Sequence, residues 1–414
     1  MKPLFLSIFV ASSAFAQLVP WAVETSAIPS TGTGDPTFVF VPGPPGNGVR
    51  LIVGTDPNLT GLFLWEPGQL PDVLPVGLVR SADARGPLLA VTSSTENTVL
   101  MFHVSDAGIV TQLDTGNFAV PSPGQVAFAE NADGGFELWV DTSSPSVEHF
   151  AISPVAGGSV TFASLGTISV PETPSGLAVD DRLGRLYVAL PTLGVLTVEP
   201  DGAQSFLISI DAGTLGGTMG GIDLYLSADG GALLFSTAPN EEEIKVHEHA
   251  GTTATFRTTL EIGDTDGGPG RSRFPRFLDV FAQAMPGFPR GVLVVEDGLM
   301  HNYKLVSLAD VDAVFPLPPA YAFTPTAPSD AGVTDGGAVD AGAPSDGGTG
   351  GGGGDGGAGG GAGGGGGAAG GGSGSPSRPS PNSVDPLPTC GCTGGSFAML
   401  PALLLLWWIR RLRS

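Results

Sequence analysis

The feature that most limits the possible folds is a short unit that recurs along the chain. Runs rich in Val, Leu, Ile, Phe and Thr follow one order, which is strand, glycine turn, strand, short gap, strand. The clearest copy has strands at 176–180, 185–190 and 194–199. Five further copies begin at Asp35, Asp83, Gln125, Ile222 and Leu278. Such a repeat, with a period of about 40 to 60 residues, is typical of radially arranged sheets.

The recurring unit predicts an all-β, six-bladed β-propeller over residues 17–322. A single sheet of this kind cannot bury both of its faces, whereas sheets in a ring cover one another and protect their edges. A pair of β-sandwich domains is the alternative, but it does not explain the recurrence. Among the predicted strands are 49–54, 98–104 and 299–305.

Residues 1–16 have the composition of a signal peptide. Lys2 supplies a positive start, residues 4–10 are apolar, and Ala14-Phe15-Ala16 forms a small-x-small cleavage site. The apolar run is much shorter than the roughly 20 residues that span a bilayer. We therefore expect an exported protein whose mature chain begins at Gln17; a buried N-terminal helix is the alternative.

Residues 323–389 consist mainly of Gly, Ala, Ser, Pro and scattered Asp. This composition cannot bury a core and predicts a disordered, glycine-rich linker. We expect it to act as a stalk that separates the propeller from the cell envelope.

Residues 390–414 predict a short hydrophobic anchor. Cys390-Gly391-Cys392 precedes an apolar run at 397–409, and an arginine cluster follows at once. The run is short for a stable span, and its arginines are expected on the inner side. The order of parts resembles the MYXO-CTERM tail of myxobacterial surface proteins. That resemblance implies trimming near the cysteines, a lipid on Cys390 or Cys392, and retention at the cell surface or outer membrane; a local Cys-x-Cys disulfide is the alternative.

Charge and cysteine content limit the partners. The chain has 17 basic and 40 acidic residues, a net charge of −23, so we expect no nucleic-acid partner and regard cations as natural ligands. The only two cysteines lie in the tail, so the propeller is expected to be held by its core without disulfides.

Three stretches carry a family resemblance, namely 175–189, 221–230 and 290–298. They are similar to the β-propeller phytases, which are calcium-dependent enzymes that hydrolyse phosphate esters of inositol hexakisphosphate. The resemblance implies a monomeric propeller whose clustered carboxylates bind Ca²⁺. The bound ions would cancel substrate charge and activate water.

The resemblance also implies site residues. The implied calcium ligands are Asp35, Asp83, Asp180, Asp181, Asp279 and Asp297, together with Asp264 and Asp266 in a short Asp-x-Asp-Gly loop; Arg85 is the implied phosphate contact. Each aspartate has an ordinary alternative, since Asp at a strand end or turn often caps backbone amides. The loop at 264–268 is equally explained as a plain turn.

Several family positions are changed. Ser175 and Gly220 stand where the family has glutamates, and residues 274–277 replace an acidic segment. Two hypotheses therefore remain open, a surface-anchored phytase-like enzyme and a catalytically inactive propeller that binds or supports other molecules.

His247 and His249 lie at alternate positions of one predicted strand, so both could face one way. Two imidazoles do not make a zinc site. We expect instead an exposed outer strand.

Overall fold

The structure is a computed structural model that describes the propeller and little else. The described residues are 16–27, 34–41, 49–55, 61–66, 70–113, 115–130, 135–153, 158–210, 213–215, 217–263 and 272–322. The predicted linker and tail, and all of the predicted signal peptide except Ala16, lie outside them. Within these ranges no helix is long and apolar enough to cross a membrane.

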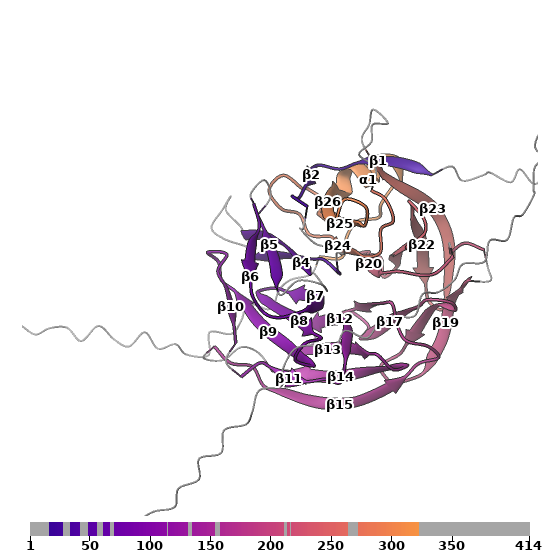
Figure 1. Cartoon of the computed structure of the whole chain (residues 1–414). Helices are drawn as coiled ribbons and strands as arrows, with labels where there is room; N and C mark the ends of the chain where they lie inside the picture. Colours follow the sequence, from indigo (N-terminus) through magenta and orange to yellow (C-terminus); the bar gives the residue numbers. More distant parts are fainter. Residues whose placement is uncertain are drawn as a thin grey trace, which may run out of the picture. The chain divides into compact units, whose positions relative to one another are not determined.

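Six sheets form a ring, which confirms the six-bladed propeller (Figure 1), and within each blade consecutive strands pair antiparallel. Blade 1 contains β3 (Thr37–Val41), β4 (Val49–Thr55), β5 (Leu62–Trp65) and β6 (Asp72–Leu74). Blade 2 contains β7 (Val79–Arg85), β8 (Leu88–Ser93), β9 (Thr98–Val104) and β10 (Val110–Gln112), with β11 (Phe118–Ala119) also on β9. Blade 3 contains β12 (Pro123–Glu130), β13 (Phe136–Thr142), β14 (Ser146–Ile152) and β15 (Phe162–Ser169).

Blade 4 contains β16 (Gly176–Asp180), β17 (Arg185–Leu190), β18 (Gly194–Val198) and β19 (Gln204–Ser209). Blade 5 contains β20 (Ile222–Leu226), β21 (Ala232–Thr237), β22 (Ile244–Ala250) and β23 (Thr253–Gly263). Blade 6 contains β24 (Leu278–Phe281), β25 (Val292–Asp297) and β26 (Asn302–Ser307). The first strand of each blade is innermost, and β3, β7, β12, β16, β20 and β24 contact one another in turn around the channel.

The N-terminal segment closes the ring. β1 (Gln17–Pro20) pairs in parallel with β23 of blade 5, and β2 (Val23–Glu24) pairs antiparallel with β26 as the outer strand of blade 6. The Trp21 ring lies 4.2 Å from Nζ of Lys304, which is almost fully buried. We call residues 17–25 the N-terminal latch; the strand pattern of the sequence did not reveal it, because each piece is too short.

The hydrophobic core is divided among the blade junctions. Each buried cluster combines side chains of two neighbouring blades, as where Leu88 of blade 2 packs with Phe128 and Leu138 of blade 3. Corresponding clusters fill the other junctions. Burying a large apolar side chain contributes about 1.5–3 kcal/mol, so the blades stabilise one another and no single blade carries its own core.

The predicted strand at 299–305 begins too early. β26 starts at Asn302, because Asp297 Oδ1 accepts the N–H groups of Leu299 and Met300, both at 3.1 Å, and holds them in a turn. His301 completes that turn in the left-handed region, with φ of 52°.

A C-terminal strap, residues 315–322, follows the short helix α1 (Leu308–Val314). It crosses blade 5, where Tyr225 Oη donates to the Pro318 carbonyl at 2.6 Å and Tyr321 N–H donates to the Leu226 carbonyl at 2.8 Å. Tyr321 then lies against the guanidinium of Arg182 and lines the central cavity. The chain therefore leaves the described region at the mouth of the channel.

Candidate functional site: the central channel

The inner strands enclose a cavity of about 130 Å³ whose polar lining is strongly acidic. Carboxyl groups come from Asp35, Asp83, Asp181, Asp223 and Asp279, and the one guanidinium in the lining is that of Arg85. All of these except Asp223 were predicted as site residues. Asp223 occupies the same place in its unit as Asp83 and Asp279, so a comparison of the repeats would have identified it.

The carboxyl groups act across blade junctions. Three of them accept a backbone N–H from the inner strand of the next blade: Asp83 from Phe128 at 2.7 Å, Asp223 from Val280 at 2.5 Å, and Asp279 from Phe38 at 2.5 Å. An inner strand forms one edge of its sheet, so the N–H groups that point away from the rest of the sheet have no neighbouring strand to bond to. A buried N–H left without a partner costs about 1–3 kcal/mol, and these carboxyl groups remove that cost.

The remaining junctions use related bonds. Asp35 Oδ2 accepts from Ser81 Oγ at 2.8 Å, and Asp181 accepts the backbone N–H of Glu130. Between blades 4 and 5, Ser175 Oγ donates to the Gly220 carbonyl at 3.0 Å. Side chains thus connect the inner strands at every junction, and we call this set the junction ring.

Burial dominates the electrostatics of the channel. It raises the pKa of Asp83 to about 7 and holds the pKa values of Asp35 and Asp223 well above their ordinary range. The carboxyl groups of Asp223 and Asp279 are hydrogen-bonded to each other, and burial raises the pKa of Asp279 too. Burial therefore disfavours a cluster of full negative charges in the channel.

Arg85 neutralises part of the remaining charge. Its Nε lies 3.4 Å from Asp181 Oδ2, and its Nη1 lies 3.7 Å from Asp83 Oδ1. Burial opposes the charge of this guanidinium, but Asp181 and Asp83 more than compensate and raise its pKa.

These carboxyl groups do not converge on one point as calcium ligands would. Calcium requires six to eight oxygen ligands, whereas the channel carboxyl groups face backbone amides, Ser81 and Arg85. In the part of the chain that the structure describes, no group of three or more His, Cys, Asp or Glu side chains could hold a metal ion. Asp264, Asp266, Cys390 and Cys392 lie outside the described residues, so their roles stay predictions.

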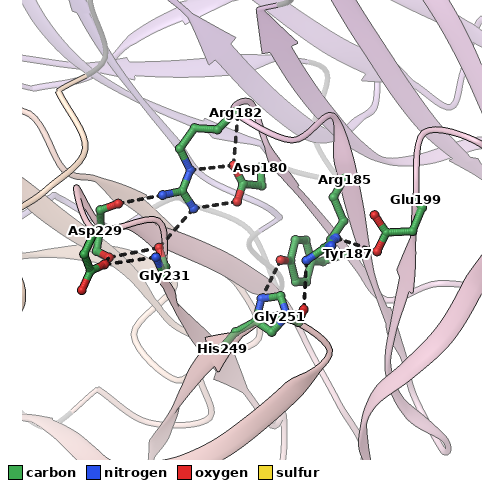
Figure 2. Close-up of polar contacts among 10 residues, drawn as sticks. Asp180, Arg182, Arg185, Tyr187, Glu199, Asp229, Gly231, His249 and Gly251 are labelled. Carbon is green, nitrogen blue, oxygen red and sulfur yellow. Dashed lines mark hydrogen bonds and ion pairs between the residues drawn. The ribbon is translucent and has the colours of Figure 1, made fainter.

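Asp180 and Asp297 do not line the channel. Asp180 is buried in a two-pronged contact with Arg182, with Oδ1 2.9 Å from Nε and Oδ2 2.7 Å from Nη2. Arg182 also donates to the Gly231 carbonyl of blade 5 (Figure 2). It donates to the Ser227 carbonyl of the same blade as well. We call this group the Arg182 clamp, because it joins blades 4 and 5. Asp297 Oδ2 lies 3.0 Å from Nζ of Lys304, and both side chains are buried.

The expectation of an exposed strand at His247 and His249 is wrong, since both side chains are buried. The outer strand β23 covers β22, and His249 reaches into blade 4, where its Nδ1 lies 2.8 Å from Tyr187 Oη (Figure 2). Its Nε2 bonds to the Gly251 carbonyl at 2.8 Å. Burial lowers the pKa of His249, and it lowers that of His247 to about 4. Both rings are therefore neutral packing groups.

Comparisons with known proteins give only distant structural likenesses. No protein family matches the chain. Among solved structures, it is similar to a calcium-binding protein, regucalcin, from Agrobacterium tumefaciens, with 12% identity and a TM-score of 0.43 over 75% of this chain and 100% of that chain. It is also similar to a chain of the mitotic checkpoint complex, with 10% identity and a TM-score of 0.43 over 74% and 96% of the two chains. At these values neither likeness carries an argument about function.

Proposed function

We propose that this chain is an exported, surface-anchored propeller that serves as a binding or structural module. In this proposal the central channel holds the ring together and performs no reaction. The supporting observation is the junction ring, in which the carboxyl groups that could have bound calcium accept backbone and hydroxyl hydrogen bonds between blades. The predicted signal peptide and hydrophobic tail support the location at the cell surface.

A calcium-dependent phosphate-ester hydrolase is the second candidate. It is favoured by the five carboxyl groups and Arg85 in one cavity, and by the sequence resemblance to β-propeller phytases. To bind calcium, however, the aspartates would have to turn away from the neighbouring blades and converge on one ion. Each inner-strand N–H that lost its partner in this way would cost about 1–3 kcal/mol.

A phosphate-release assay separates the two candidates. Residues 17–322 would be incubated with phytate, with and without millimolar Ca²⁺, and inorganic phosphate would be followed. We expect no calcium-dependent release from folded protein. Calcium-dependent turnover that is lost in the Arg85→Ala variant would replace our proposal with the second candidate.

Thermal unfolding with calcium and with a chelator provides an independent check. A ligand that binds only the folded state raises the unfolding midpoint, by about 2.7 kcal/mol of stability at 100 times its dissociation constant. We expect the same midpoint under both conditions. A higher midpoint with calcium would show that a calcium site exists, in the channel or in the loop at 264–268.

A further inference from the structure

Three large apolar side chains gather at exposed turns of blade 6. Phe274, just before β24, is 42% exposed, and Leu299 and Met300, in the turn between β25 and β26, are 49% and 52% exposed. The two segments touch, because Gly298 N–H donates to the Arg273 carbonyl at 2.9 Å. We call Phe274, Leu299 and Met300 the apolar tip.

The backbone holds the apolar tip outward. Phe274 has a φ of 54°, a conformation that bulky side chains adopt only when the surroundings enforce it. Here Glu296 provides the constraint, since its Oε2 accepts the Arg276 N–H and its carbonyl accepts Ser272 Oγ–H, both at 2.9 Å. Asp297 fixes the facing turn through the N–H groups of Leu299 and Met300. Hydrogen bonds to Glu296 and Asp297 thus hold both of the turns that carry these half-exposed side chains.

The charges beside the apolar tip are largely paired. Arg273 Nε lies 3.9 Å from Glu242, while Lys245 bonds to both Glu241 and Glu243. Arg276 is exposed. A partner would therefore meet an apolar surface with little net charge, although the chain as a whole carries −23.

We propose that the apolar tip inserts shallowly and reversibly into the interface of a lipid bilayer. The inference rests on the surface anchoring proposed above, since the predicted tail, through a lipid on Cys390 or Cys392 or through its apolar run, would keep a bilayer near the propeller. Three side chains on two turns are far fewer than the roughly 20–30 residues that each partner contributes to a stable protein interface. Weak insertion becomes effective when a tether raises the local concentration, and stable anchoring takes two signals.

Vesicle binding by residues 17–322 tests the proposal, because this fragment contains the closed ring and lacks the apolar tail. The probe is large phosphatidylcholine vesicles in a sedimentation assay. We expect binding that persists in about 0.5 M NaCl, where charge interactions are screened. The double variant Phe274→Ser, Leu299→Ser should lower the vesicle partition coefficient by about tenfold or more, from the loss of apolar area.

The matched control is Phe162→Ser, Leu165→Ser, which removes two equally exposed apolar side chains from the rim strand β15. It should bind like the unchanged fragment. Absence of binding by the unchanged fragment, or equal losses in both double variants, would overturn the proposal. Self-association through the tip without vesicle binding would also overturn it.

A tryptophan at the tip gives a direct readout. The Phe274→Trp variant should show a blue shift on addition of vesicles and quenching by brominated lipid chains; an unchanged spectrum would contradict insertion. These results do not depend on the phosphate-release assay, so a hydrolase that binds vesicles would overturn the proposed function and leave this inference standing.

Discussion

Asp180 and Arg182 show what a single buried ion pair does in this ring. Asp180 is 1% exposed, and its two oxygens face the guanidinium, which also satisfies two carbonyls of the next blade. Removing one charge from such a pair leaves the other buried without a partner, which is far costlier than losing an exposed contact. The resemblance had implied a calcium ligand at Asp180, whereas the cation beside it is supplied by the protein.

The Arg182→Leu variant should therefore lose roughly 3–5 kcal/mol of unfolding free energy, measured by urea denaturation of residues 17–322. The matched control is Arg257→Leu, because Arg257 and its partner Glu248 are both 48% exposed. That exposed pair should contribute about 1 kcal/mol or less. Equal losses of unfolding free energy in the two variants would show that the Arg182 clamp contributes no more to stability than an exposed ion pair.

Asp141 predicts a pH dependence. Asp141 is 3% exposed, and burial raises its pKa to about 8, although hydrogen bonds from the Gln125 and Gly124 amides act to lower it. Because the folded pKa exceeds the unfolded value of about 3.9, the folded state binds the proton more tightly. The contribution of Asp141 to the unfolding free energy is therefore fully present below about pH 4 and is lost as the pH rises toward 8.

The unfolding free energy of the Asp141→Asn variant should consequently decline less between about pH 4 and 8 than that of the unchanged protein. In the unchanged protein, Asp141 adds up to about 1.4 kcal/mol per pH unit to this decline. Asp83 contributes in the same direction, so the decline is reduced and not abolished. His247 acts oppositely below about pH 6.5. The control is Asp201→Asn at an exposed turn, and a parallel pH profile for Asp141→Asn would refute the assignment.

Among the elements, the N-terminal latch has the largest structural consequence. Its two strands cover the edges of β23 and β26, and Thr25 exchanges bonds with Tyr303, donating its N–H to the carbonyl and accepting the Tyr303 N–H on Oγ1. Lys304 also contacts Trp21 and lies 3.7 Å from Glu24. The latch thus connects residues 17–25 to the last blade.

Deletion of residues 17–25 should lower the unfolding free energy by roughly 3 kcal/mol or more, from the lost ladder bonds. The uncovered edges should also promote dimers, which size-exclusion chromatography would detect. A synthetic peptide of residues 17–27 should restore the midpoint, whereas a scrambled peptide should not. A deletion variant as stable and monomeric as the parent would show that blades 5 and 6 need no outer strand.

Sequence reasoning located most elements because apolar runs bounded by turn residues are local signals. The strand at 98–104 was predicted with its observed bounds, while β26 was misplaced because the apolar Leu299 and Met300 resemble the start of a strand, although Asp297 holds them in a turn. The latch and the burial of His249 escaped detection for a different reason. Both are decided by neighbouring blades, which a single stretch of sequence does not specify.

At the scale of the molecule, recurrence predicted the ring and its number of blades, since a sheet that repeats must bury its faces against its copies. The chemistry of the channel could not be predicted in the same way. Whether Asp279 meets a metal ion or the Phe38 amide depends on how two inner strands, 241 residues apart in sequence, lie beside each other. The sequence identified four of the five channel carboxyl groups but not their use.

The latch has a consequence for synthesis. Thr25 and Tyr303 are partners separated by 278 positions, so the latch waits for almost the last part of the propeller. Until that part is synthesised, the product is an open arc with uncovered apolar faces, and folds dominated by such distant contacts form slowly. A frameshift or stop codon anywhere before Ser307 would therefore yield no smaller working ring, only material for chaperones and proteases.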